Sequence, residues 1–223
     1  MIKAIICDFD FTLADSSPGV VACANEALRS LGLPEASAEH IRATIGLSMA
    51  HTLRQLTGRE DPALVATFTE RFVAHADQVM HGLTTLYPWV AETVQTLRAR
   101  SCRLGIVSSK YRYRIARILD EHGLAPHFDV IVGGEDVSQH KPDPAGLHLA
   151  LQRFGLSTAE VLYIGDHPVD AQAASSAGVP FMAVLTGTSA RASFAPYRVQ
   201  RFLADFSHVP HHLPALDTTP PTA

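Results

Sequence analysis

The regular alternation of strand-like and helix-like segments after Pro88 limits this chain to few folds. Short apolar runs typical of buried strands occupy residues 103–107, 129–132, 161–164 and 181–185. Before and between them, apolar residues recur with helical spacing over residues 89–100, 111–122, 147–154 and 168–177. Strands that alternate with helices are joined by right-handed crossovers, so the pattern predicts a parallel sheet with helices packed on it.

One further strand-like run, residues 3–9, stands apart at the start of the chain. About 100 residues separate Asp8 at its end from Ser108 at the end of the next strand, whereas a strand-helix-strand unit needs roughly 30. The surplus shows only helical patterns, at residues 20–31, 38–45, 48–56 and 62–79. We therefore predict an α/β fold: a Rossmann-like parallel sheet core from residues 1–15 and 86–223, with a small all-helical cap domain inserted over residues 16–85.

Composition excludes several classes of function. The net charge of −4 gives no basic surface of the kind that nucleic acid or an anionic membrane would select. The apolar run at the N-terminus is too short for a signal peptide or a spanning helix, and the 3 cysteines lack the spacing of a zinc site or a disulfide framework. We expect a cytoplasmic monomer or homodimer that acts on a small molecule.

Polar residues follow the predicted strands at the sheet edge where ligands of open parallel sheets bind. They are Asp8, Asp10, Ser108, Ser109, Lys141, Asp166 and Asp170. Four converging carboxylates would repel one another by about 4 kcal/mol per close pair at an effective dielectric near 20, and the single lysine offsets only part of this. Oxygen ligands without Cys or His favour a hard cation, and the need to keep water and phosphate oxygens in its shell favours Mg²⁺.

The same residues form four ordered motifs. The chain reads DFDFTL from Asp8, LGIV before Ser108, KPDP from Lys141, and GDHPVD ending at Asp170. These motifs resemble those of the haloacid dehalogenase superfamily, and the resemblance covers residues 2–209. The predicted cap resembles the small helical type that phosphoglycolate phosphatases carry. The resemblance implies a Mg²⁺-dependent phosphatase that acts on a small phosphorylated metabolite such as phosphoglycolate.

The resemblance also implies roles for the four carboxylates. Asp8 would attack phosphorus and form an aspartyl-phosphate. Asp10 would protonate the leaving oxygen and then deprotonate the hydrolytic water. Asp8, the main-chain carbonyl of Asp10, and Asp166 would hold Mg²⁺, with Asp170 as either a further ligand or an anchor behind the ligands.

The remaining motif residues would bind the phosphoryl group. Ser108 and the Ser109 N–H would hold its oxygens, and Lys141 would stabilise the group in transfer and orient Asp8. Many members of the superfamily have Gly where this chain has Phe11, which leaves the shape of the turn after the nucleophile open.

Substrate selection is predicted to come from the cap, because the motifs contact only the phosphoryl group and the metal. The favoured contact is the turn at residues 44–48, where Gly46 permits close backbone approach. Ser48 can cap the next helix, whose N–H groups would then face a substrate carboxylate, with help from Arg42 or Arg54.

Other functions stay open at this point. The motifs also fit a β-phosphoglucomutase-like sugar phosphomutase or a pyrophosphatase, and the fold alone would serve a catalytically inactive binding module. A dehalogenase is disfavoured because it needs no acid at the position of Asp10. A phosphonatase is disfavoured because it needs a cap lysine, and all lysines lie outside the predicted cap, at Lys3, Lys110 and Lys141.

Two other segments are interpreted as non-functional. The stretch around His208, His211 and His212 is rich in proline and has no acidic or Cys partner, so we expect a solvated end of the chain and no metal site. Residues 186–189 follow the last predicted strand, and their composition favours a plain loop.

Overall fold

The computed structural model describes residues 1–213 and contains a six-stranded parallel sheet with the order β5-β4-β1-β6-β7-β8. Strand β1 (Ala4–Cys7) lies at the centre, between β4 (Arg103–Val107) and β6 (Val161–Gly165). The outer strands are β5 (Val130–Val132), β7 (Phe181–Val184) and β8 (Arg201–Leu203). The predicted α/β fold with a parallel sheet is confirmed.

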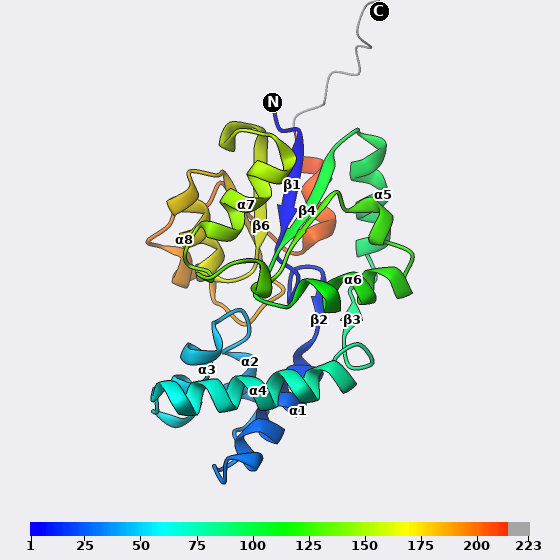
Figure 1. The fold of residues 1–223 in the computed structure, drawn as a ribbon. Helices are drawn as coiled ribbons and strands as arrows, with labels where there is room; N and C mark the ends of the chain where they lie inside the picture. Colours follow the sequence, from blue (N-terminus) through cyan, green and yellow to red (C-terminus); the bar gives the residue numbers. More distant parts are fainter. Residues whose placement is uncertain (214–223) are drawn as a thin grey trace, which may run out of the picture.

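Helices cover both faces of the sheet (Figure 1). Helices α5 (Val90–Ala99) and α6 (Arg112–Glu121) pack on one face, and α7 (Ala145–Phe154) and α8 (Pro168–Ala177) pack on the other. Coverage on both sides explains why the central strands are continuous apolar runs and show no polar alternation. It also leaves the carboxyl ends of the strands as the open edge of the sheet.

The sheet extends one strand beyond the predicted set. Strand β8 pairs with β7, with Met182 opposite Arg201. Its three residues carry no periodic pattern, so the sequence gives no local signal for it. Short 3₁₀ helices complete this half, at Ala125–His127, Gly134–Asp136, Thr158–Glu160, Arg191–Phe194 and Phe206–His212.

The last of these 3₁₀ helices corrects the expectation of a solvated end. Phe206 and Val209 are fully buried and belong to the core on the α5 side of the sheet. The Arg100 guanidinium donates a hydrogen bond to the Pro210 carbonyl at 2.6 Å, which ties the segment to α5. His208 and His211 are exposed, so the histidines face outward from a segment whose apolar side chains are buried.

Four helices lie between Asp15 and Thr85: α1 (Ser17–Ser30), α2 (Ala38–Arg42), α3 (Met49–Thr57) and α4 (Pro62–Val79). The side chains of Ser37, Ser48 and Asp61 accept backbone N–H bonds at the starts of α2, α3 and α4, as helix caps do. These helices share a buried apolar cluster of their own, which includes Leu28, Ile41, Leu53, Phe68 and Phe72.

Two short strands join the helices to the rest of the molecule. Strand β2 (Ala14–Asp15) pairs antiparallel with β3 (Thr85–Leu86), so the chain enters and leaves the helical half side by side (Figure 1). The sequence-based bounds of a cap at residues 16–85 stay a prediction. Within residues 1–213, no helix has the length and apolar character needed to cross a membrane.

Candidate active site

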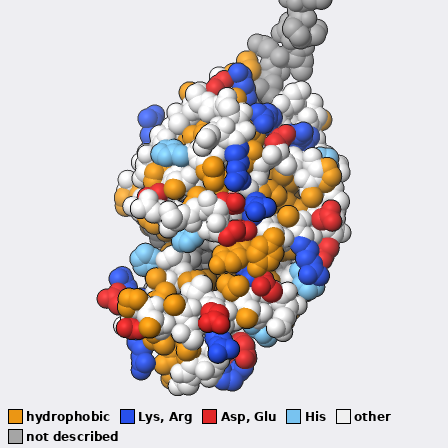
Figure 2. All heavy atoms as spheres, viewed as in Figure 1, with side chains coloured by type: hydrophobic (Ala, Val, Ile, Leu, Met, Phe, Trp, Pro, Cys, Tyr) orange, Lys and Arg blue, Asp and Glu red, His pale blue; other side chains and the backbone are white. Residues whose placement is uncertain are grey.

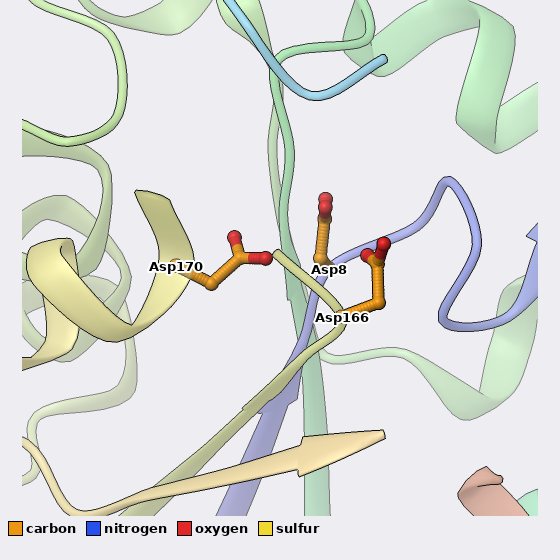
Figure 3. Close-up of side chains that lie close together, drawn as sticks. All are labelled: Asp8, Asp166 and Asp170. Carbon is orange, nitrogen blue, oxygen red and sulfur yellow. The ribbon is translucent and has the colours of Figure 1, made fainter. Parts of the chain in front are cut away.

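Three carboxylates meet at the carboxyl edge of the sheet (Figure 3). Asp8 follows β1, Asp166 follows the neighbouring strand β6, and Asp170 lies in the first turn of α8. One oxygen from each lies within 4.8 Å of the others, and all three side chains are buried. Parallel neighbours end at the same edge, and this brings together residues that are 158 positions apart in sequence, as Asp8 and Asp166 are.

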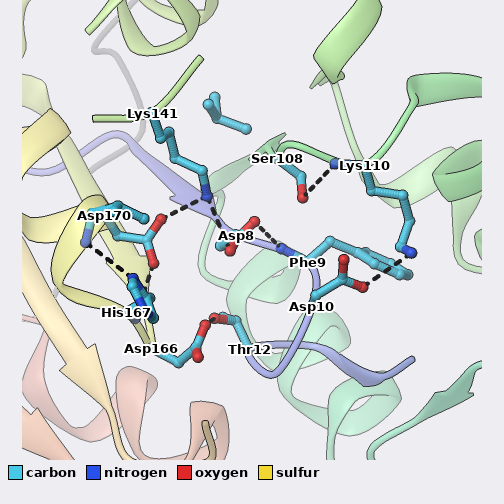
Figure 4. Close-up of polar contacts among 12 residues, drawn as sticks. Asp8, Phe9, Asp10, Thr12, Ser108, Lys110, Lys141, Asp166, His167 and Asp170 are labelled. Atoms are coloured by element: carbon cyan, nitrogen blue, oxygen red, sulfur yellow. Dashed lines mark hydrogen bonds and ion pairs between the residues drawn. The ribbon is translucent and has the colours of Figure 1, made fainter. Parts of the chain in front are cut away.

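Lys141 lies between two of these carboxylates (Figure 4). Its ammonium is 3.0 Å from Asp8 Oδ2 and 2.6 Å from Asp170 Oδ1. Asp170 Oδ1 also accepts the Tyr163 hydroxyl at 2.9 Å, and its Oδ2 accepts the His167 N–H at 3.0 Å. Both oxygens of Asp170 therefore already hold neighbouring groups. Tyr163 was not predicted as a site residue, because it lies inside an apolar strand.

Burial makes these charges costly. Burial raises the pKa of Asp8 to about 6, although the nearby Lys141 lowers it. Burial, and after it the carboxylates of Asp170 and Asp8, raise the pKa of Asp166 well above its usual value. Burial alone would lower the pKa of Lys141, but Asp170 and Asp8 more than offset this and raise it. Three acids and one lysine leave this cluster short of positive charge.

Asp10 does not join the three carboxylates. Its Oδ1 accepts the Ser16 hydroxyl at 2.5 Å and lies 3.2 Å from the Lys110 ammonium. Four carboxylates were expected to converge, but the side chain of Asp10 points toward this lysine (Figure 4). Lys110 was not predicted as a site residue and entered the sequence-based argument only as a lysine outside the cap. Its position directly after Ser108 and Ser109, at the ligand edge of the sheet, was a signal that could have identified it.

The two serines follow β4 beside Asp8. The Ser108 N–H donates to the Val132 carbonyl at 3.0 Å, which fixes the start of the loop. The Ser108 side chain is buried, and its Oγ accepts the Lys110 N–H at 3.4 Å. Ser109 is half-buried and lines the pocket described below. Both predicted serines therefore lie at the same edge as the carboxylates.

The turn after Asp10 has the conformation that glycine favours. Phe11 has a φ of 58°, in the left-handed region that costs a bulky residue about 1–2 kcal/mol. The Phe11 N–H donates to the Ala14 carbonyl at 2.7 Å, and the Thr186 hydroxyl donates to the Phe11 carbonyl. The Arg42 guanidinium lies 5.2 Å from the centre of the buried Phe11 ring. Phe11 thus keeps the turn that Gly would make, because contacts on several sides offset the strain.

The loop at residues 186–189 touches the site, and the expectation of a plain loop was wrong. Besides the Thr186 contact, Gly187 packs against Asp166, where a Cβ would lie 1.9 Å from Oδ2. The Thr12 hydroxyl donates to Asp166 Oδ1 at 3.3 Å. Asp166 is therefore enclosed by the loop after β1, which carries Thr12, and by the loop after β7, which carries Gly187. The sequence around Gly187 does not predict its contact with Asp166, and Thr12 is marked only by its place in the DFDFTL motif.

A pocket of about 370 Å³ separates the sheet edge from the helical half. Asp10, Ser109, Lys110 and Arg114 line it on one side. The other side is mostly apolar and includes Val20, Ile45, Leu47, Met49, Val65 and Phe72. Figure 2 shows apolar side chains gathered at the level where the two halves of the molecule meet.

The predicted specificity turn lines this pocket. Gly46 has a φ of 95°, and a Cβ there would lie 4.0 Å from Cγ of His167, so the turn approaches the loop that carries Asp166. Arg54 lies 3.5 Å from Glu60 on the exposed surface. Arg42 contacts Phe11 and Ser17 instead. Neither arginine is among the residues that line the pocket within the described part of the chain.

Known proteins share both the sequence and the fold. The sequence profile of the haloacid dehalogenase-like hydrolases matches residues 5–184. Phosphoglycolate phosphatase of Yersinia pseudotuberculosis is 33% identical over 219 residues, which cover 96% of this chain and 93% of that protein. Phosphoglycolate phosphatase of Escherichia coli O157:H7 is 33% identical over 207 residues, which cover 83% of this chain and 82% of that protein.

Solved structures agree with this grouping. A haloacid dehalogenase-like hydrolase from Bacteroides fragilis superimposes with a TM-score of 0.91 at 38% identity, over 94% of this chain and 100% of that one. The resemblance inferred from the four motifs is confirmed, because the profile spans all of them. This chain therefore belongs to the haloacid dehalogenase-like hydrolase family.

Proposed function

We propose that this chain is a phosphatase that hydrolyses a small phosphate monoester, with phosphoglycolate as the model substrate and Asp8 as the nucleophile. The observation that carries the proposal is the position of Asp8, buried between Lys141 and the carboxylates of Asp166 and Asp170. Relatives named phosphoglycolate phosphatase, which align along most of this chain, support the choice of substrate class.

The first step is an attack by Asp8. Its Oδ1 accepts the Phe9 N–H at 2.7 Å, and its Oδ2 lies 3.0 Å from the Lys141 ammonium. A bond forms between a carboxylate oxygen and phosphorus while the bond from phosphorus to the ester oxygen breaks. Lys141 lowers the repulsion between the carboxylate and the incoming phosphoryl group, and Ser108 with the Ser109 N–H binds the phosphoryl oxygens.

Asp10 moves the protons. In its protonated form it gives a proton to the departing ester oxygen, and as a carboxylate it then takes one from the water that hydrolyses the aspartyl-phosphate. The hydrogen bond from Ser16 orients it for both tasks. Water releases phosphate and restores the Asp8 carboxylate, which completes the cycle.

The acidic residues fit a hard divalent cation, for which we propose Mg²⁺. The cluster offers buried carboxylate oxygens within 4.8 Å of one another. Asp8, Asp166 and the Asp10 carbonyl would hold the ion, which when bound supplies positive charge to the phosphoryl oxygens. Asp170 Oδ1 lies 2.6 Å from the Lys141 ammonium, and we assign Asp170 to holding this lysine in place.

The helical half is proposed to act as a cap over residues 16–85 that closes on the substrate. The paired strands β2 and β3 would serve as its hinge. Its separate apolar cluster allows the helices to move as one unit. The expected cytoplasmic location and monomeric or homodimeric state stay predictions.

A phosphate-release assay tests the function. The purified chain is given about a hundred phosphorylated metabolites and one aryl phosphate, with Mg²⁺ and with a chelator. We expect Mg²⁺-dependent release that is highest for small phosphorylated carboxylates. A chain that releases phosphate from none of them would be an inactive binding module, and preference for pyrophosphate or interconversion of sugar phosphates would assign one of the rival activities.

A further inference from the structure

Lys110 is a buried lysine that the steps above do not use. Only 4% of its side chain is exposed. Its N–H contacts Ser108 Oγ, and its carbonyl accepts the Gly134 N–H at 3.1 Å, so its main chain is fixed on the phosphoryl side of the pocket. The long side chain then crosses to Asp10 (Figure 4). Its ammonium therefore lies beside the acid that serves the leaving group.

The surroundings of this ammonium differ from those of the other buried lysine. Lys141 lies within 3.0 Å of two carboxylates. Within residues 1–213, Asp10 is the one carboxylate within 4.0 Å of the Lys110 ammonium, and it shares that oxygen with Ser16. An ammonium has three N–H donors, and a buried one gains from each further acceptor. Lys110 can therefore bind an anion without giving up Asp10.

Arg114, which also lines the pocket, already has hydrogen-bond partners in the protein. The Arg114 guanidinium donates to Asp77 at 2.6 and 2.8 Å and to the Val73 carbonyl at 3.0 Å. These contacts draw it toward α4. Of the Lys and Arg side chains that line the pocket in the described part of the chain, Lys110 is thus the one with N–H donors left for a substrate; the imidazole of His140 also lines the pocket. One ammonium suits a singly charged group better than a phosphate dianion, which would need further cations.

We propose that Lys110 determines specificity by binding a carboxylate on the leaving group of the substrate. The inference rests on the proposed phosphatase function and refines it. Since Asp10 serves the ester oxygen and Lys110 lies 3.2 Å from Asp10, the carboxylate belongs close to that oxygen, as in a two-carbon phosphorylated acid. The apolar wall opposite, which includes Ile45 and Phe72, disfavours polyol substrates because their hydroxyls would lose water without gaining partners.

The test compares substrates whose leaving group carries a carboxylate with substrates whose leaving group has no charge. Phosphoglycolate, its methyl ester and ethyl phosphate are compared by kcat/KM with wild type, Lys110→Met and Lys110→Arg. We expect wild type to prefer phosphoglycolate over both uncharged analogues by about 10- to 100-fold, the range for a hydrogen bond to a charged group. In Lys110→Met the ratio of kcat/KM for phosphoglycolate to that for ethyl phosphate should fall toward 1, in addition to any loss that all three substrates share through Asp10, while Lys110→Arg should retain part of the preference.

Several outcomes would overturn the inference. Equal losses for all three substrates in Lys110→Met would mean that Lys110 acts only through Asp10. Equal rates for the three substrates with wild type would refute it even if the variants fail to fold. Lys3→Met serves as the matched control, because Lys3 is 59% exposed and pairs with Glu160. If wild type hydrolyses neither these substrates nor an aryl phosphate, the proposed function fails, which is a separate result.

Discussion

The carboxyl edge of the sheet and the helical half differ in how many charged side chains they present where they meet at the pocket. At the carboxyl edge of the sheet, Asp8, Asp166 and Lys141 are buried; Lys141 pairs with Asp8, and the Thr12 hydroxyl donates to Asp166. On the helical side the lining is mostly apolar, and its charged neighbour Asp77 contacts Arg114 at the seam between the halves. The sheet side suits the part common to all phosphate esters. The helical side, whose lining also includes the hydroxyls of Thr44, Ser48, Thr52 and Thr69, should select a leaving group mainly by its shape.

This difference implies a difference in tolerance. Groups that must hold charge in a buried site lose function when any partner moves, because each carboxylate depends on the others. An apolar wall tolerates a change of shape at a smaller cost. Substitutions on the sheet side should therefore reduce turnover of every substrate, and substitutions on the helical side should change the order of preference among substrates.

The largest loss is expected for Asp8→Asn. Asparagine keeps the shape but cannot attack phosphorus, so turnover of every substrate should fall by about 10⁴-fold or more. Steady-state kinetics measures the loss, and circular dichroism checks the fold. A well-folded variant that keeps more than about a hundredth of wild-type turnover would remove Asp8 as the nucleophile.

Asp10→Asn should discriminate between substrates by their leaving groups. General acid catalysis supplies roughly 10²- to 10⁴-fold, and an activated aryl leaving group needs little of it. Phosphorylation of Asp8 by an alkyl phosphate should therefore slow far more than phosphorylation by an aryl phosphate. Single-turnover experiments isolate this step. Equal losses for the two substrates would exclude the acid role.

Gly187→Ala should lower turnover without removing any polar group. The new Cβ would lie 1.9 Å from Asp166 Oδ2, so the carboxylate must move. A misplacement of about 1 Å can cost about 10²-fold in rate. The control is Gly82→Ala, where the nearest atom would be 3.9 Å away. Similar rates for both variants would mean that the position of Asp166 is not critical.

Gly46→Val should have the smallest effect and act on preference. The side chain would enter the space between the turn and His167, so bulky leaving groups should lose about 10-fold in kcat/KM relative to small ones. Gly46 and Gly58 both have positive φ, but a Cβ at Gly58 would meet nothing within 4 Å. Gly58→Val therefore carries the backbone strain alone. If the two variants rank substrates alike, the turn does not select them.

Much of the sheet side could be predicted from the sequence. Parallel strands end at one edge, so residues that directly follow β1, β4 and β6 had to lie near one another once the alternation of helix and strand was recognised. Asp8, Ser108 and Asp166 were identified in this way. The helical insertion was also predictable, because local apolar spacing and caps such as Ser48 and Asp61 determine helices within a few turns.

Other features depended on contacts between distant parts of the chain. Asp10 turns away from the other carboxylates because Lys110, 100 positions later, lies within 3.2 Å. Strand β8 forms because β7 offers an unpaired edge, although residues 201–203 have no pattern of their own. Gly187 is restricted by Asp166, and Phe11 keeps a left-handed turn because Thr186 and Arg42 hold it.

The division has one physical reason. The spacing of apolar residues within short segments predicts the helices and strands, and the order of these elements predicts the edge of the sheet where ligands bind. The partner of a buried charge is decided by which side chains the packed elements bring within a few ångströms, and nothing in the residues around Asp10 or Lys110 encodes that distance. The sequence by itself determined which residues could carry the chemistry, and the tertiary structure decided which of them share a charge.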